Sequence, residues 1–190
     1  MYPVFLSFAG RRVVVVGGGP VAASKIAALV AEGAQVTVVA PDVRPEIERR
    51  AGVTIVRRPF EPQDLDEAWW VVAAAPPEVN RRVGEAAAAR RLFVNAVDDP
   101  AHATAYLGGV VRRAGVTVAI STEGRAPALA GLLREAIEAA LPHDLDRWMA
   151  AADDARREWK RDGVPMEHRR PQLLERLNAL YARPDARDES

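Results

Sequence analysis

The chain has 190 residues, of which 49% are hydrophobic and 27% charged, and its 26 basic residues equal its 26 acidic ones. This composition indicates a soluble globular protein of one or two units, and the balanced charge implies no polyanionic partner such as nucleic acid. No apolar run reaches the roughly 18 to 20 residues of a membrane span, and the N-terminus does not resemble a secretory signal, so we expect a cytoplasmic protein without a membrane partner. Cysteine is absent, which excludes disulfides and thiolate chemistry.

Short β-branched runs alternate with Ala-rich helical stretches over roughly the first 120 residues. The expected strands are residues 12–16, 35–40, 53–56, 68–74, 92–97 and 115–120. Their near-continuous apolarity is typical of strands that are buried on both faces. The alternation predicts an α/β fold, with a Rossmann-type parallel sheet and helices on both of its faces.

A glycine-rich turn, Gly17-Gly-Gly-Pro-Val-Ala22, follows the first expected strand and fits the pattern G-x-G-x-x-A. Gly17 permits a tight turn, Gly19 lets the backbone approach a pyrophosphate, and Ala22 allows close packing of helix and strand. The helix expected at 21–32 would direct its N-terminal N–H groups at an anion. A turn selected only for packing is the alternative, but the strand before it and the helix after it favour dinucleotide binding.

Asp42 follows the second expected strand, 20 positions beyond Ala22. A carboxylate at this place accepts hydrogen bonds from ribose hydroxyls and repels a 2′-phosphate, which favours NAD over NADP. Two alternatives stay open. Asp42 caps a helix that starts near Pro45, or Arg44 accommodates a 2′-phosphate.

The pattern changes after residue 142, where strand-like runs cease and two amphipathic helices are expected. The first carries Trp148, Ala152, Ala155 and Trp159 on one side, and the second carries Leu173, Leu174, Leu177, Leu180 and Tyr181. We therefore expect an NAD-binding Rossmann domain at 1–115, a strand and helix on the dimerisation and substrate side at 116–142, and a helical region with a frayed tail at 143–190. Such short helices must pack on the first domain or on another copy of the chain.

Further segments accompany the glycine turn in a characteristic order. They are Gly33-Ala-Gln-Val-Thr-Val-Val-Ala-Pro41, Val94-Asn-Ala-Val-Asp-Asp-Pro100, Val118-Ala-Ile-Ser-Thr-Glu-Gly124, Pro127-Ala-Leu-Ala130 and Leu133-Arg-Glu135. Together this set resembles the precorrin-2 dehydrogenase/sirohydrochlorin ferrochelatase family, which also forms the N-terminal part of sirohaem synthases. The resemblance covers roughly residues 1 to 142. It implies a homodimer in which NAD accepts a hydride from the tetrapyrrole precorrin-2 to give sirohydrochlorin, with ferrous iron inserted by some members to make sirohaem.

The same resemblance assigns the cofactor site. It implies that Pro20 and Val21 lie against NAD, and that Pro41 and Asp42 lie at its adenosine side, in addition to the turn residues Gly17 and Gly19.

The family's catalytic aspartate falls on Asp98. This residue ends an apolar strand at the edge where open α/β sheets bind ligands, and a carboxylate there can accept the proton of a dehydrogenation or collect protons from pyrrole nitrogens. The alternative is that Asp98, or more suitably Asp99, caps a helix beginning near Pro100. His102 nearby is expected either to assist proton transfer or metal contact, or to be a surface histidine on that short helix.

Three arginines, Arg112, Arg113 and Arg125, are candidates to pair with the carboxylates of precorrin-2, or else form a solvated loop face. No His or Cys cluster offers a preformed metal site, so an inserted metal would be coordinated mainly by the tetrapyrrole.

Three stretches depart from the family pattern. Residues 73–77 read Ala-Ala-Ala-Pro-Pro where the family usually has Ala-Ala-Thr-Asp-Asp, and residues 106–109 and 121–127 also differ. Because these changes lie on the presumed substrate side, they leave iron insertion and the substrate open. A non-catalytic NAD-binding regulatory module and an oxidoreductase with a different substrate are the alternative functions.

Overall fold

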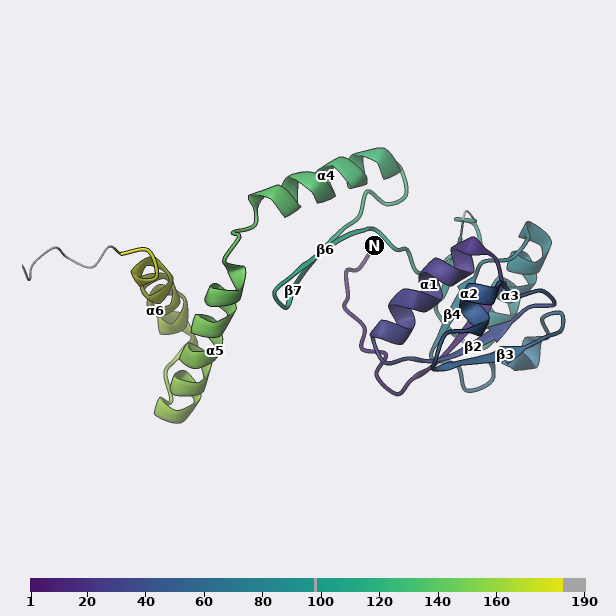
Figure 1. The fold of residues 1–190 in the computed structure, drawn as a ribbon, viewed down its shortest axis with the longest axis horizontal. Helices are drawn as coiled ribbons and strands as arrows, with labels where there is room; N and C mark the ends of the chain where they lie inside the picture. The colour runs from purple at the N-terminus through teal and green to yellow at the C-terminus, as the bar shows by residue number, and fades with distance from the viewer. Residues whose placement is uncertain (98, 183–190) are drawn as a thin grey trace, which may run out of the picture. The chain divides into compact units, whose positions relative to one another are not determined.

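The computed structural model describes residues 1–97 and 99–182 (Figure 1). The chain divides into two units, Met1–Leu107 and Gly108–Ser190. The expected domain boundary after residue 115 would cut through a strand pair of the second unit. The observed division lies just before that pair begins.

A five-stranded parallel sheet forms the centre of the first unit. Its strands are β1 (Arg12–Val16), β2 (Gln35–Val39), β3 (Val53–Val56), β4 (Trp70–Ala73) and β5 (Val94–Ala96), in the spatial order β3-β2-β1-β4-β5. The central strand β1 is the most deeply buried, with Val13 to Val16 at most 2% exposed. The predicted parallel sheet is confirmed for these strands, and its apolar runs are explained by burial on both faces.

Helices cover both faces of this sheet, as predicted. They are α1 (Pro20–Ala31), α2 (Pro45–Glu48), the 3₁₀ helix η1 (Pro62–Leu65) and α3 (Pro77–Ala89). Alternate residues of each strand point to opposite faces. Val13 and Val15 therefore pack in one core cluster with Ile26 of α1, whereas Val14 packs in the other with Val83 of α3.

The second unit begins with an antiparallel hairpin of β6 (Gly109–Arg113) and β7 (Val116–Ile120). The prediction that residues 115–120 continue the parallel sheet is wrong, because β7 pairs with β6 in a separate two-stranded sheet. The turn between them consists of Ala114 and Gly115, whose φ values are 49° and 80°. Two residues with positive φ form the tight turn that suits a β-hairpin.

Three helices complete the second unit: α4 (Pro127–Ala140), α5 (Leu145–Asp162) and α6 (Met166–Ala179). The predicted amphipathic character of α5 is confirmed, since Ala155 and Trp159 are buried. The Trp159 indole N–H donates to Gln172 of α6 at 2.6 Å, and Gly163 ends α5 in the left-handed conformation. None of the described helices is long and apolar enough to cross a membrane.

Candidate active site

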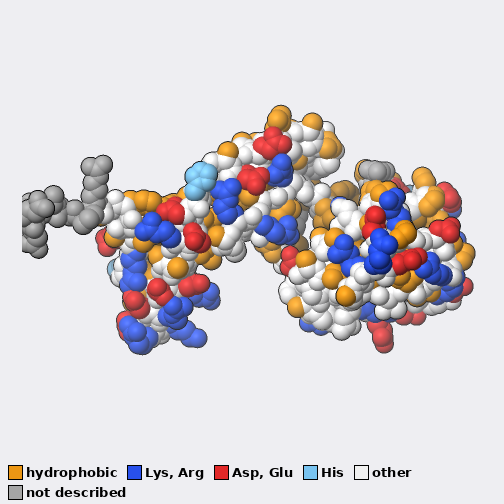
Figure 2. Space-filling model, viewed as in Figure 1, with side chains coloured by type: hydrophobic (Ala, Val, Ile, Leu, Met, Phe, Trp, Pro, Cys, Tyr) orange, Lys and Arg blue, Asp and Glu red, His pale blue; other side chains and the backbone are white. Residues whose placement is uncertain are grey.

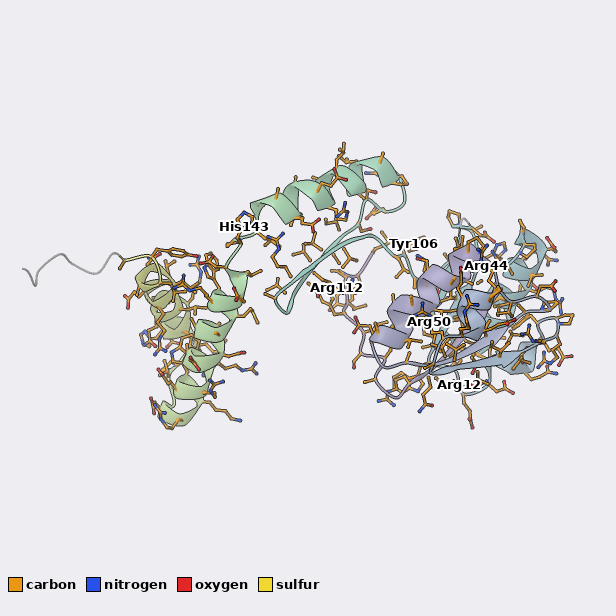
Figure 3. The ribbon with its side chains drawn as sticks, in the orientation of Figure 1. Arg12, Arg44, Arg50, Tyr106, Arg112 and His143 are labelled. Atoms are coloured by element: carbon orange, nitrogen blue, oxygen red, sulfur yellow. The ribbon has the colours of Figure 1, made fainter. Side chains whose placement is uncertain are left out.

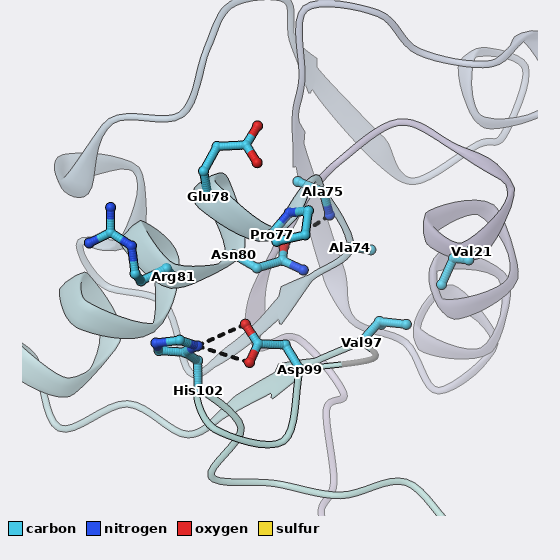
Figure 4. A pocket seen from close by; sticks show the side chains of 10 residues that line it. All are labelled: Val21, Ala74, Ala75, Pro77, Glu78, Asn80, Arg81, Val97, Asp99 and His102. Carbon is cyan, nitrogen blue, oxygen red and sulfur yellow. Dashed lines mark hydrogen bonds and ion pairs between the residues drawn. The ribbon is translucent and has the colours of Figure 1, made fainter.

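A cavity of about 650 Å³ opens at the carboxyl ends of β1, β4 and β5 (Figure 4). It is lined by Val21, Ala74, Ala75, Pro77, Glu78, Asn80, Arg81, Val97, Asp99 and His102. The strands β1 and β4 are neighbours in the sheet, although β2 and β3 lie between them in sequence. The cavity therefore lies where the strand order reverses, which is the usual ligand site of an open α/β sheet.

The glycine-rich turn leaves β1 with two glycines that the chain itself requires. Gly17 has a φ of 122°, and a β-carbon added to it would lie 2.1 Å from the carbonyl oxygen of Ala74. A β-carbon on Gly18 would lie equally close to the carbonyl oxygen of Asp42. These contacts are too short for any side chain, so both glycines are explained by packing of the turn against β4 and the loop after β2.

Gly19 differs from both of its neighbours, because a β-carbon added to it would meet nothing within 4 Å. It is the N-cap of α1, with a φ of −85°, and provides no side-chain cap for the first turn. The N–H groups at the start of α1 are thus left without a side-chain acceptor beside open space. This is the arrangement that holds an anion such as a dinucleotide pyrophosphate, and the turn fits that group.

The first residues of α1 connect this turn to the cavity. Pro20 is the first helical residue and is exposed, and Val21 is 42% exposed and lines the cavity. Both therefore lie where the sequence places the cofactor. Their direct contact with NAD stays a prediction.

Pro41 and Asp42 lie in the exposed loop after β2, and the backbone of Asp42 packs against the glycine turn. The Arg44 N–H donates to the carbonyl oxygen of Gly18 at 3.0 Å. Arg44, not Asp42, is the N-cap of α2, so the capping alternative for Asp42 is wrong. The Arg44 side chain, at α2 in Figure 3, forms an ion pair with Glu46 at 3.0 Å.

The segment after β5 carries the predicted catalytic residue, Asp98, which lies outside the described residues. Its neighbours in sequence, Val97 and Asp99, both line the cavity. The alternative of a helix that begins near Pro100 is wrong, since residues 99–108 form turns and irregular structure. Asp99 accepts hydrogen bonds from Nδ1 of His102 at 2.9 and 2.8 Å instead of capping a helix.

The start of α3 forms the remaining wall of the cavity and was not predicted as part of the site. Pro76 and Pro77 occupy the N-cap and first helical positions, where missing N–H groups cost no helical hydrogen bond. The Ala75 N–H donates to the side-chain oxygen of the buried Asn80 at 3.0 Å. The departure from the family pattern at 73–77 is thus compatible with the helix. The only sequence signal for this wall was the Pro-Pro helix start.

The three predicted substrate arginines belong to the second unit. Arg112 and Arg113 lie on β6, and Arg125 lies in the loop before α4 (Figure 3 labels Arg112). Arg113 donates to the carbonyl oxygen of Leu141 at 3.0 Å. Over the described ranges, no group of three or more His, Asp or Glu side chains is placed to hold a metal ion.

Comparison with known proteins identifies both units. A family model described as "Putative NAD(P)-binding" matches residues 4–109, and one described as "Sirohaem biosynthesis protein central" matches residues 113–140. The solved structure of SirC, precorrin-2 dehydrogenase, has a TM-score of 0.74 and 27% sequence identity, covering 92% of this chain and 88% of the other. The predicted family resemblance and Rossmann-type fold are therefore confirmed.

Curated relatives agree with these matches. A siroheme synthase of Aeromonas hydrophila subsp. hydrophila is 39% identical over 97% of this chain, and one of Photorhabdus laumondii subsp. laumondii is 37% identical over 95%. The chain spans 41% of the first of these relatives and 39% of the second. The similarity thus concerns one part of longer proteins.

Proposed function

Because the chain belongs to this NAD(P)-binding family, we propose that it oxidises precorrin-2 to sirohydrochlorin with NAD as the hydride acceptor, a reaction of sirohaem biosynthesis. One observation carries the proposal: a single cavity is lined both by Val21, next to the glycine turn, and by Val97 and Asp99, on either side of Asp98 in sequence. A dehydrogenation needs a hydride acceptor and a proton acceptor close to the same substrate, and we propose that both act in this cavity.

The residues of the chain have distinct parts in this reaction. The N–H groups after Gly19 hold the pyrophosphate, Val21 supports the nicotinamide half, and the carboxylate of Asp98 takes part in acid–base catalysis at the tetrapyrrole. When bound, NAD supplies a ring that takes up a hydride. The apolar groups of the cavity wall limit the access of water to the substrate.

We assign NAD rather than NADP because of the loop after β2. The exposed carboxylate of Asp42 is available to ribose hydroxyls and repels a 2′-phosphate. Arg44, a cation two residues beyond Asp42, is already paired with Glu46 at 3.0 Å.

We also propose that the chain acts as a homodimer through its second unit. Helix α4 exposes Leu129, Leu132 and Leu133, which are 49%, 65% and 41% accessible, and Figure 2 shows apolar side chains at the surface of this helix. An isolated two-stranded hairpin with one helix buries little apolar surface of its own. A second copy of the chain, bound symmetrically through the same surface, buries these leucines. The cytoplasmic location stays a prediction.

The test is an anaerobic incubation of the purified protein with precorrin-2 and NAD. The expected result is one NADH formed for each sirohydrochlorin that appears in the absorption spectrum. NADP in place of NAD should be used poorly. Ferrous iron added afterwards shows whether the same protein also makes sirohaem, with the tetrapyrrole as the main ligand of the metal.

The variant Asp98→Asn separates the enzyme from the alternative functions. We expect its turnover to fall by roughly 10²- to 10⁴-fold, the usual contribution of an acid–base residue, while NAD affinity stays unchanged. A folded wild-type protein that binds NAD without oxidising precorrin-2 would instead support the regulatory module or a different substrate.

A further inference from the structure

A carboxylate–histidine pair, Asp99 and His102, lies in the cavity and has no part in the function proposed so far. We infer that His102, oriented by Asp99, is a further catalytic residue that accepts the proton released when the tetrapyrrole is oxidised. The inference rests on the proposed function and deepens it, because it assigns the proton to a named nitrogen atom, Nε2 of His102.

The hydrogen bonds of the pair determine the state of the imidazole. An ionised carboxylate only accepts hydrogen bonds, so the Nδ1 atom, 2.8 and 2.9 Å from the two oxygens of Asp99, must carry a proton. In the neutral ring, Nε2 then holds the free lone pair, which is the atom that acts as a base. A carboxylate bound to Nδ1 also stabilises the imidazolium that forms when Nε2 takes up a proton.

The position of the ring leaves that lone pair available. Nε2 makes no hydrogen bond or ion pair with any other residue that the structure describes. It is also not one of the buried side-chain nitrogen or oxygen atoms that lack a partner, so it is accessible. The Asp99 side chain is 18% exposed and the His102 side chain 33%. The carboxylate is thus the more buried member of the pair, and both side chains line the cavity (Figure 4).

The helix beneath the pair holds it in place. Gly84 lies inside α3, where glycine usually weakens a helix, and a β-carbon on it would lie 2.9 Å from Cβ of His102. The absence of a side chain at Gly84 therefore lets the turn of His102 lie directly on α3. A backbone hydrogen bond from the His102 N–H to the Asp99 carbonyl, at 3.3 Å, closes the same turn.

Few other charged side chains of the described residues line the cavity next to His102. From α3, Glu78 and Arg81 line the cavity, and Arg81 is paired with Glu85 at 2.8 Å. From the turn itself, Asp99 is the carboxylate in direct contact with the ring. Among the described residues, Glu78, Arg81 and Asp99 are thus the charged side chains that line the cavity together with His102.

The proposed step is balanced as follows. One hydrogen of the reduced tetrapyrrole leaves with its electron pair as a hydride to the bound dinucleotide. A second hydrogen leaves as a proton to Nε2 of His102, and the electron pair of its former bond becomes the new double bond. The imidazolium then returns the proton to solvent.

The test compares wild type, His102→Gln and Asp99→Asn in anaerobic turnover at saturating NAD and precorrin-2 over a range of pH. In wild type we expect kcat to rise with pH through a single ionisation. His102→Gln should lose that ionisation and at least about 10² in kcat, with NAD affinity unchanged. Asp99→Asn should also lower kcat, because the two carboxylate oxygens that orient the His102 ring are no longer both present. As a matched control, His143→Gln changes an exposed histidine of the second unit and should leave rate and profile unaltered.

Two further measurements distinguish catalysis from a purely structural role. Added imidazole should restore part of the activity of His102→Ala, which a lost packing contact would not allow. Nitrogen NMR of the free protein should show the neutral His102 ring protonated on Nδ1. A ring protonated on Nε2, or a His102→Gln variant with the wild-type rate and pH profile, would overturn the inference while leaving the dehydrogenase intact. No turnover by the wild type would instead refute the proposed function and this inference with it.

Discussion

The two units of the chain differ in how many apolar residues they bury. In the first unit, the inner strands of the sheet are covered by helices and neighbouring strands, and Val13, Val14 and Val15 are fully buried. In the described part of the second unit, the buried hydrophobic residues are few. They are Val111, Ala130, Leu145, Ala155 and Trp159. The first unit thus has a large core of its own, although it also exposes Phe5, Trp69 and Phe93, whereas the second unit has only a small core beside the exposed leucines of α4.

The residues of the two units are therefore constrained for different reasons. In the first unit, residues near the cavity are limited by close backbone contacts that the chain makes with itself. In the second unit, the exposed leucines of α4 are explained by no contact within the unit. Substitutions in the first unit should therefore change folding or cofactor binding, and substitutions on α4 should change assembly.

The largest expected effect is from Gly17→Ala. Its β-carbon would overlap the carbonyl oxygen of Ala74 at 2.1 Å, and the φ of 122° is unfavourable for alanine. We expect a loss of roughly 3 kcal/mol in the free energy of unfolding, measured by urea denaturation. A wild-type midpoint would contradict the described path of the turn.

A smaller effect is expected from Leu132→Glu on α4. A charge placed at the 65% exposed Leu132 should leave the free energy of unfolding of the monomer nearly unchanged but weaken the proposed dimer by about 2 kcal/mol. Sedimentation velocity over a range of concentrations measures the change. Glu135→Gln, an exposed polar site on the same helix, should leave the dimer intact, and a Leu132→Glu variant that still dimerises at the wild-type concentration would place the interface elsewhere.

Gly19→Ala is the control for Gly17→Ala, and it should change the affinity for NAD but not the stability of the protein. No atom lies within 4 Å of the added β-carbon and the φ of −85° suits alanine, so stability should be unchanged. The methyl group would narrow the approach of the pyrophosphate and weaken NAD binding about tenfold, or roughly 1.4 kcal/mol. Calorimetric titration with NAD gives the affinity. Unchanged binding would mean that the pyrophosphate does not approach this residue.

The smallest effect concerns the pH dependence of the first unit. Burial raises the pKa of Asp64, but hydrogen bonds from Arg58 and from the Glu61 N–H outweigh it and hold this pKa below its ordinary value. The stabilisation is therefore complete above the ordinary pKa of about 3.9 and is lost as the pH falls below it. Asp64→Asn should cost about 1 kcal/mol at neutral pH and flatten the acid limb of the stability curve. Asp66→Asn, at a 61% exposed carboxylate, should change neither.

The same contrast explains which features were predictable from sequence. The strands β1 to β5 were predicted because burial on both faces leaves continuous apolar runs. Residues 116–120 form a similar run but belong to a hairpin, and only the two-residue turn Ala114-Gly115 distinguishes the two cases. The strand before that turn, β6, contains Arg112 and Arg113. Because of these polar residues, it was not predicted as a strand.

The site was predicted where backbone geometry requires particular residues and missed where side chains meet across the fold. The glycine turn carries its own signature, so its position was predictable. A helix cap was the alternative role considered for Asp99, because Asp-Pro is a common helix start. Its hydrogen bonds to His102 and the space left by Gly84 depend on how the turn packs on α3, which local sequence does not encode.

The measurement that tests the central claim most directly is a crystal structure of the protein with NAD bound. The account predicts the pyrophosphate at the N–H groups after Gly19, the ribose at Asp42, and the nicotinamide ring in the cavity between Val21 and Val97. A dinucleotide bound away from the glycine turn, or a nicotinamide ring outside that cavity, would contradict it.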